Sequence, residues 1–250
     1  MPSLPTKLII LDTVDSTNNY AMGLIKTGGL SGENAVFARN QTAGKGQRGK
    51  QWNANPGENI ILSVITEMQW LPISRQFELS VAVALGCHDL VSKYINSGVK
   101  VKWPNDLFIN DSKTGGVLIE NVIKGTLWQW AVIGIGINVN QLKFEDFNIS
   151  ATSLQQNSSL HYDVLKLAEE LHTTILERIE QVRMGKFAAL LEEYNEKLYA
   201  KDRLVKLGKG NIVFNTTIKR VSGSGQLITS DVIERQFNFD EVSFRGIVDD

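Results

Sequence analysis

Glycine and positive charge are concentrated in the segment 44–51, which reads Gly-Lys-Gly-Gln-Arg-Gly-Lys-Gln and leads directly to Trp52. Glycines let a backbone come close to a ligand and leave its N–H groups exposed. The side chains of Lys45, Arg48 and Lys50 add the positive charge that suits a phosphate or a developing oxyanion. Trp52 adds a flat face on which a base can stack. The segment is therefore typical of an anion-binding loop, and a solvated loop with an incidental run of charge is an equally good interpretation.

The spacing of these glycines also fits two nucleotide-binding patterns that the context excludes. It satisfies G-x-G-x-x-G and nearly satisfies the P-loop pattern at Lys50, but the P-loop needs Ser or Thr where Gln51 stands. Both motifs also require a helix directly afterwards. Residues 52–57 contain Asn, Pro and Gly and lead into an apolar run that predicts a strand. A dinucleotide-binding fold and a P-loop nucleoside triphosphatase are therefore disfavoured.

Two further polar clusters stand near predicted strand ends, where ligands often bind. The segment 102–106 reads Lys-Trp-Pro-Asn-Asp and presents the amide of Asn105 beside the carboxylate of Asp106. Lys113 precedes the glycine pair at 115–116. An ordinary turn and a hairpin tip are the simpler interpretations of these two clusters.

Polar groups also accompany the first predicted helix and a glycine-bearing strand. Three adjacent hydrogen-bonding side chains stand at the start of that helix: Ser16, Thr17 and Asn18. Plain helix capping explains them equally well. Gly134 and Gly136 interrupt a strand that continues to Asn138, and glycine inside a strand often marks the close approach of a ligand or of another backbone. Crowded packing is the alternative.

The cysteine and the histidines do not form a plausible reactive or metal site. Cys87 and His88 are neighbours on a predicted helix, so their side chains point apart. His161 and His172 lack the spacing of metal ligands, and there is no second cysteine, so a structural zinc site is not expected. A lone cysteine cannot form an internal disulfide and favours a reducing compartment.

The hydrophobic pattern predicts the strands and helices that must position these residues. Strands are predicted over 8–12, 35–39, 59–66, 99–103, 107–109, 115–123 and 127–138, with a loop over 41–57. Helices are predicted over 20–26, 76–95, 164–183 and 187–198. Beyond residue 200 the helical period disappears, and short runs over 204–207, 212–220, 226–229 and 232–237 alternate with glycines. We therefore expect an α/β domain over 1–200 and a small β-barrel or sandwich over 201–250, docked on the first domain.

Composition limits the function classes. The chain has 250 residues, with 26 basic and 27 acidic side chains, giving a net charge of −1, and is 42 % apolar. A disordered chain and a uniformly basic nucleic-acid surface are excluded. No segment approaches the roughly 18 apolar residues of a membrane helix, and the start of the chain does not read as a secretory signal. We expect a cytoplasmic protein.

The nearly neutral net charge conceals a local excess of cations, since no acidic residue occurs between Glu33 and Glu58.

In their order and spacing, five segments resemble the BirA-type biotin protein ligases: 15–18, 41–52, 102–106, 113–116 and 134–138. The resemblance implies an α/β (α+β) catalytic domain similar to class II aminoacyl-tRNA synthetases, with a mixed sheet and flanking helices, followed by an SH3-like β-barrel. It implies a two-step reaction, in which biotin and ATP give biotinyl-5′-AMP and pyrophosphate, and a lysine of a biotin carboxyl carrier domain then takes the biotin. The first strand starts near residue 8, so we expect the form without an N-terminal DNA-binding domain.

The resemblance also assigns residue roles. It implies biotin contacts for Ser16, Thr17, Asn18, Gln41, Lys45, Gly46, Gln47, Lys113, Gly116 and Gly134. It implies nucleotide contacts for Lys45, Arg48, Lys50, Trp52, Asn105, Asp106, Lys113 and Asn138. Of these, Lys113, Arg48 and Lys45 are the expected catalytic residues, and Asp106 is the expected neighbour of Mg²⁺. The expected partner is the carrier domain of a biotin-dependent carboxylase, with no DNA and no membrane, and the chain is a monomer or a homodimer.

The loop departs from the family at Gln47, where an arginine commonly helps to hold the adenylate. A neutral amide cannot pair bidentately with phosphate. Either Lys45 or Arg48 compensates, or the adenylate is held more loosely. The alternative functions are a lipoate-type ligase of the same fold, a biotin-responsive repressor, and a regulator that binds biotinyl-adenylate without ligase activity; the presence of Lys113 disfavours the last.

Overall fold

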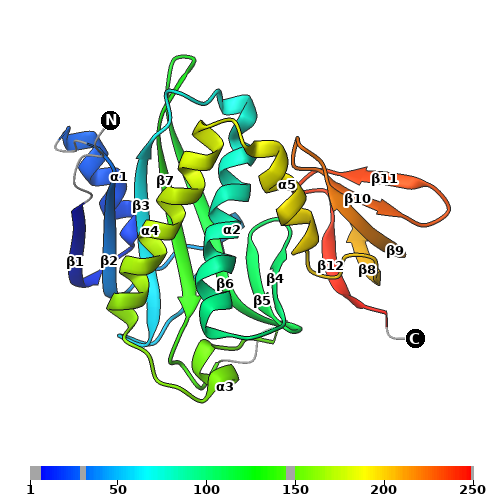
Figure 1. The fold of residues 1–250 in the computed structure, drawn as a ribbon, viewed down its shortest axis with the longest axis horizontal. Helices are drawn as coiled ribbons and strands as arrows, with labels where there is room; N and C mark the ends of the chain where they lie inside the picture. Colours follow the sequence, from blue (N-terminus) through cyan, green and yellow to red (C-terminus); the bar gives the residue numbers. More distant parts are fainter. Residues whose placement is uncertain (1–6, 29–31, 145–149, 249–250) are drawn as a thin grey trace.

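The computed structural model describes residues 7–28, 32–144 and 150–248, so residues 1–6, where no secretory signal is expected, lie outside the described part. The larger of two sheets has seven strands in the order β1-β2-β3-β7-β6-β5-β4 (Figure 1). Its strands are β1 (Lys7–Val14), β2 (Asn34–Gln41), β3 (Asn59–Glu67), β4 (Val99–Lys102), β5 (Asp106–Ile109), β6 (Ser112–Lys124) and β7 (Leu127–Asn138). Only the β1–β2 pair among them is parallel. The predicted mixed sheet is confirmed.

Helices cover both faces of this sheet. They are α1 (Thr17–Thr27), α2 (Gln76–Tyr94), α3 (Leu154–Ser158), α4 (Val164–Arg183) and α5 (Phe187–Glu196), with 3-10 turns η1 (Gln47–Gly49) and η2 (Ile73–Arg75). Successive strand residues face opposite sides of a sheet, and here Val64 and Ile65 belong to two separate apolar clusters. The cluster of Ile65 includes Ala21 of α1, and the cluster of Val64 includes α2 and α4. In the described residues, no helix is long and apolar enough to span a membrane.

The long helix α2 is apolar on most of its surface because it is buried between the sheet and α4. A Cβ added at Gly86 would lie 2.7 Å from the Cδ1 atom of Ile175, so the glycine lets α2 and α4 approach closely. The predicted bounds of α4, 164–183, are confirmed, and α1 ends as expected at Gly28, which has a φ of 70°.

The C-terminal part forms the predicted separate β unit. Its five antiparallel strands follow the order β11-β10-β9-β8-β12. They are β8 (Leu204–Lys209), β9 (Ile212–Val221), β10 (Leu227–Ser230), β11 (Glu234–Phe237) and β12 (Ser243–Ile247). Buried side chains of this sheet, such as Val205 and Val221, belong to the same apolar cluster as α2 and α5. The β unit is therefore docked on the first domain, as expected. The boundary between 200 and 201 stays a prediction.

Several elements differ from the sequence prediction. The short helix α3 was not expected, although Ser153 and Gln156 form a capping box at its start. Strand β12 was missed because it is short and interrupted by Gly246, where the pairing with β8 shifts register. Strand β6 begins at Ser112, so Lys113 lies within the strand instead of in the turn before it.

Candidate functional site

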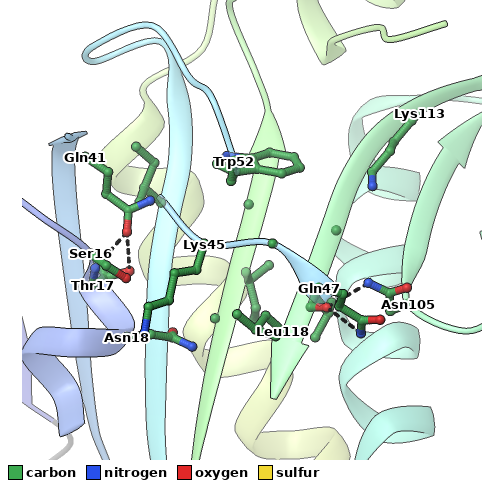
Figure 2. A pocket seen from close by; sticks show the side chains of 17 residues that line it. Ser16, Thr17, Asn18, Gln41, Lys45, Gln47, Trp52, Asn105, Lys113 and Leu118 are labelled. Carbon is green, nitrogen blue, oxygen red and sulfur yellow. Dashed lines mark hydrogen bonds between the residues drawn. The ribbon is translucent and has the colours of Figure 1, made fainter. Parts of the chain in front are cut away.

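Two adjoining cavities lie beside the large sheet, the first over its central strands and the second toward the edge formed by β5 and β4. The first lies between the start of α1, the glycine loop and strands β6 and β7 (Figure 2). Every residue for which the resemblance implies a biotin contact lines it: Ser16, Thr17, Asn18, Gln41, Lys45, Gly46, Gln47, Lys113, Gly116 and Gly134. The second lies beside it, between the loop, the segment 102–106 and the C-terminal sheet. Residues far apart in the sequence are thus brought together.

The polar end of the first cavity is held by hydrogen bonds between α1 and the neighbouring strands. The Oε1 atom of Gln41 accepts from the backbone N–H of Thr17 at 2.7 Å and lies 3.1 Å from its hydroxyl (Figure 2). Ser16 occupies the N-cap position but makes no capping hydrogen bond with its side chain. Capping therefore does not explain the 16–18 cluster, because Gln41 satisfies the first N–H of the helix instead.

Ser63 extends this network and was missed by the sequence prediction. It is fully buried in β3, with its Oγ atom 2.8 Å from Oγ1 of Thr17 and 2.6 Å from Oδ1 of Asn18. A buried hydroxyl normally has a partner, so a lone serine in the apolar run of β3 was the available signal. The network fixes the directions of Thr17 and Asn18 before any ligand binds.

Lys45 lies at the same polar end. The Nδ2 atom of Asn18 donates to Glu120 at 2.7 Å, and the ammonium of Lys45 is 3.7 Å from the other oxygen of that carboxylate. Figure 2 shows the Lys45 side chain extending toward Asn18. Lys45, for which the resemblance implies both biotin and nucleotide contacts, lines the first cavity only, so the structure separates it from the second cavity, which Arg48 and Lys50 line.

Two glycines of β7 make room for side chains of the site. A Cβ added at Gly134 would lie 2.4 Å from Oδ1 of Asn18, and one at Gly136 would lie 2.3 Å from Cε2 of Trp52. The indole of Trp52 therefore lies directly against the strand. Its Nε1 atom is buried without a hydrogen-bond partner in the described residues. By contrast, a Cβ at Gly116 would make only ordinary contacts with Lys113 and Asp106, at 3.5 Å.

Lys113 stands where the two cavities meet, and it lines both. Its Nζ atom lies 2.5 Å from Oδ1 of Asp106 and 5.9 Å from the ring centre of Trp52. Pairing of β5 with β6 brings Lys113 opposite Phe108, and a register shift next to that pair sets Asp106 opposite Gly116. The ammonium is thus fixed by a carboxylate at the junction.

The second cavity is larger, about 280 Å³ against about 60 Å³, and is strongly cationic. Its lining contains one acid, Asp106, and four cations: Arg48, Lys50, Lys102 and Lys113. Trp52 and Asn105 also line it. This balance of charge suits a polyanion.

The C-terminal sheet closes this second cavity. Arg48, in a left-handed conformation with a φ of 56°, donates from Nη2 to the carbonyl of Phe239 at 2.7 Å, and its guanidinium lies 4.9 Å from the centre of that ring. Val242 and Phe244 also line the cavity. Sequence reasoning missed these C-terminal residues, because no spacing rule connects positions almost 200 residues apart.

Gln47 and Asn105 share one acceptor. Both side-chain amides donate to the backbone carbonyl of Val117, at 3.3 Å and 2.9 Å (Figure 2). The neutral side chain of Gln47 therefore forms part of the wall between the two cavities and ties the loop to β6.

Asn138 is placed apart from the site. It is buried, donates to the carbonyl of Thr152 at 3.0 Å, and lines neither cavity. Cys87 is buried in α2, where burial raises the pKa of its thiol to about 12. Among the described residues, no three His, Cys, Asp or Glu side chains gather closely enough to hold a metal ion by themselves.

Known proteins resemble this chain over most of its length. The sequence profile of the Biotin/lipoate A/B protein ligase family matches residues 10–138. The bifunctional ligase/repressor BirA of Escherichia coli K12 is 28 % identical over 239 residues, which cover 95 % of this chain and 74 % of BirA. A biotin–[acetyl-CoA-carboxylase] ligase of Paracoccus denitrificans is 34 % identical over 132 residues, covering 52 % of this chain and 53 % of that protein.

The fold has a close counterpart among solved structures. The biotin protein ligase from Aquifex aeolicus in complex with biotin and ATP aligns with a TM-score of 0.81 and 23 % identity, covering 96 % of this chain and 99 % of that one. This confirms the predicted architecture of a mixed α/β sheet followed by a C-terminal β unit. Since the family profile spans just over half of the chain and includes the loop, the 102–106 segment and Lys113, the chain belongs to the biotin/lipoate A/B protein ligase family.

Proposed function

We propose that this protein is an ATP-dependent biotin protein ligase. It forms biotinyl-5′-AMP from biotin and ATP, and then transfers biotin to a lysine of a biotin carboxyl carrier domain. The observation that carries the proposal is the junction of the two cavities at Lys113, because a reaction between a carboxylate and a phosphate needs one cation that faces both anions.

The first cavity suits the ureido ring of biotin. That ring offers two N–H donors and one oxygen, which match the hydroxyls and amides of Ser16, Thr17 and Asn18. The network through Gln41 and Ser63 holds these groups in place. The biotin protein ligase from Aquifex aeolicus, whose fold this chain shares, has been solved in complex with biotin and ATP.

The second cavity suits ATP. Its larger volume and its four cations fit a triphosphate, and the ring of Trp52 offers a platform for adenine. Mg²⁺ commonly binds through one or two carboxylates together with substrate phosphates. Asp106, the one acid of the lining, would hold it there, and the ion would shield the charge of the phosphates.

In the first step, a carboxylate oxygen of biotin attacks the α-phosphorus of ATP, and the bond to the β-phosphate oxygen breaks to release pyrophosphate. The ammonium of Lys113 reduces the repulsion between the carboxylate and the phosphate and stabilises the charge of the transition state. In the second step, the neutral amine of the carrier lysine attacks the carbonyl carbon and the bond between this carbon and the phosphate oxygen breaks. An amide forms, the amine releases a proton, and AMP leaves with the electron pair.

A lipoate-type ligase is the alternative within the family. Lipoate has an apolar dithiolane ring, which gains nothing from the polar end formed by Ser16, Thr17 and Asn18. The same polar end favours biotin. We place the activity in the cytoplasm, in keeping with the lone, unpaired Cys87.

The deciding experiment is the transfer of radiolabelled biotin to a purified carrier domain with ATP and Mg²⁺, with unlabelled biotin or lipoate as competitor. We expect label on the carrier that depends on ATP and is displaced by biotin but not by lipoate. A carrier whose target lysine is replaced by arginine is the control for the acceptor. Labelling that lipoate abolishes at equal concentration, or no labelling at all, contradicts the proposal.

A further inference from the structure

Lys102 ends strand β4, and its side chain is buried at the wall of the second cavity, with 9 % of the residue exposed. Its ammonium lies 4.6 Å from the ring centre of Phe108 and 4.5 Å from that of Phe244. Phe108 belongs to β5 of the large sheet, and Phe244 belongs to β12 of the C-terminal sheet. The cation is therefore held between aromatic rings that come from the two sheets.

This ammonium lacks the partner that a buried cation normally has. Within the described ranges, no hydrogen bond or ion pair joins it to another side chain, since the nearby carboxylate of Asp106 is paired with Lys113. Burial lowers the pKa of Lys102, and Lys113 and Lys50 lower it further, whereas Asp106 raises it. The rings contribute only a weak attraction. A desolvated positive charge thus faces a cavity whose lining carries more cations than acids.

The position of Lys102 separates its role from that of Lys113. Lys113 also lines the first cavity, so it serves the carboxylate and the α-phosphate, whereas Lys102 lines only the second. Arg48 and Lys50 face the same cavity from the exposed loop. Lys102 is instead buried at a strand end, so little conformational freedom remains to be lost when an anion binds.

We propose that Lys102 binds the β- and γ-phosphates of ATP and the pyrophosphate that leaves, and that Phe244 is the positioning residue for its ammonium. This inference rests on the proposed function. When the bond between the α-phosphorus and its bridging oxygen breaks, the electron pair moves to pyrophosphate, and Lys102 faces that new charge. The C-terminal sheet is thereby part of the adenylation site and not of the biotin site.

The test separates the two half-reactions. Biotin-dependent exchange of labelled pyrophosphate into ATP reports adenylation, and transfer from synthetic biotinyl-5′-AMP to a carrier domain reports the second step. We expect Lys102→Met to raise the KM for ATP or lower the exchange rate about tenfold or more. Transfer from synthetic adenylate and the affinity for biotin stay within about twofold. Lys102→Arg, which keeps the charge, recovers part of the loss.

Lys100→Met is the matched control, because Lys100 lies two residues earlier on β4 and lines neither cavity of the site. Phe244→Leu removes the ring while keeping an apolar side chain. We expect it to raise the KM for ATP about threefold with little change in the second half-reaction, and Phe244→Tyr to behave as wild type. If Lys102→Met does not fold, the variants Phe244→Leu and Phe244→Tyr test the same proposal.

Unchanged ATP dependence in Lys102→Met, or equal losses in both half-reactions, overturns the role of Lys102. Absence of biotin-dependent exchange in the wild-type protein would instead contradict the proposed function. The two failures are therefore distinguishable.

Discussion

The guanidinium of Arg48 donates a hydrogen bond of 2.7 Å to the backbone carbonyl of Phe239 and lies over the ring of the same residue. The two residues are 191 positions apart in the chain. This contact fastens the glycine loop to the C-terminal sheet across the mouth of the cavity that we assign to ATP. A loop residue implied to hold phosphate is therefore also a link between the two parts of the molecule.

Loss of either partner should weaken ATP binding through the same contact. Phe239→Ala removes the ring but keeps the backbone bond, and a cation–π contact at an exposed site is worth about 0.5–1 kcal/mol. We expect a twofold to fivefold rise in the KM for ATP, and a larger rise in Arg48→Ala. In a double-mutant cycle the two effects should fall short of additivity by a similar energy. Full additivity within about 0.3 kcal/mol would mean that the contact is not used in the working enzyme.

Lys113→Ala should abolish most adenylate formation while leaving the fold intact. The ammonium faces both cavities, and removing one preorganised charge from such a site typically costs about 10²- to 10³-fold in rate. The rate of biotinyl-5′-AMP formation measures the effect, and circular dichroism with thermal unfolding checks the fold. A variant that makes the adenylate at the wild-type rate would show that this lysine has another role.

Gly134→Ala and Gly136→Ala should damage different ligand sites. The added methyl at 134 meets the amide of Asn18, and the one at 136 meets the indole of Trp52. Forced overpacking costs about 1–3 kcal/mol. We expect the first variant to weaken biotin binding and the second to weaken ATP binding, both measured by calorimetry.

The control for these variants is Gly23→Ala in α1, where nothing lies within 4 Å of the new methyl. That change should stabilise the protein by about 0.5–1 kcal/mol, because alanine favours a helix interior over glycine. Equal effects of both β7 variants on both ligands would argue for general strand damage.

A buried histidine gives a pH-dependent contribution to stability. His172 in α4 is 6 % exposed, and its Nε2 atom has no hydrogen-bond partner in the described part of the chain. Burial lowers its pKa from the ordinary value near 6.5. Below that value the unfolded chain binds the proton more readily than the folded protein, so the free energy of unfolding should decrease as the pH falls below about 6.5.

Urea unfolding at pH 7.5 and pH 5.5 measures this effect. Other groups also titrate in this range, so the quantity of interest is the difference between wild type and His172→Leu, in which the contribution is absent. His161→Asn, a change at an exposed position, should keep the wild-type dependence. An unchanged dependence in His172→Leu would exclude this histidine as the cause.

Local physical signals in the sequence predicted the long elements, whereas the family resemblance supplied the set of residues that lines the first cavity. The period of α4 and the glycines of β7 are local signals, and they led to the right helix bounds and to a strand that accommodates close neighbours. The sequence did not predict Ser63, whose role depends on which strand lies beside α1, nor Phe239, which reaches the site only after the C-terminal sheet docks.

The roles of single polar residues were harder to predict. Lys45 and Asn138 occur in segments that carry the family resemblance, yet Lys45 lies beside Glu120, and Asn138 is bonded to a backbone carbonyl outside both cavities. Tertiary packing determines which partner such a side chain contacts, and a local sequence pattern does not predict it. The nucleotide role of Asn138 therefore stays a prediction that its placement does not support.

Gln47 should make the protein release its adenylate faster than an arginine at the same position would allow. Its amide is neutral and donates to the carbonyl of Val117, while Lys45 and Arg48 are engaged with Glu120 and Phe239. Charged bidentate contacts to phosphate are stronger than neutral ones. We expect Gln47→Arg to slow the release of biotinyl-5′-AMP about tenfold, measured by rapid filtration in the absence of a carrier.

Gln47→Met separates charge from packing, because it removes the bond to Val117 without adding a cation. It should release the adenylate at least as fast as wild type. If the wild-type protein retains its adenylate tightly, the cations of the loop must compensate, and Lys45→Ala combined with Arg48→Ala should then speed its release. If the double variant still retains its adenylate tightly, both hypotheses are excluded: Gln47 does not weaken adenylate binding, and Lys45 and Arg48 do not compensate for it. The adenylate would then have to be bound by the strands beneath the loop.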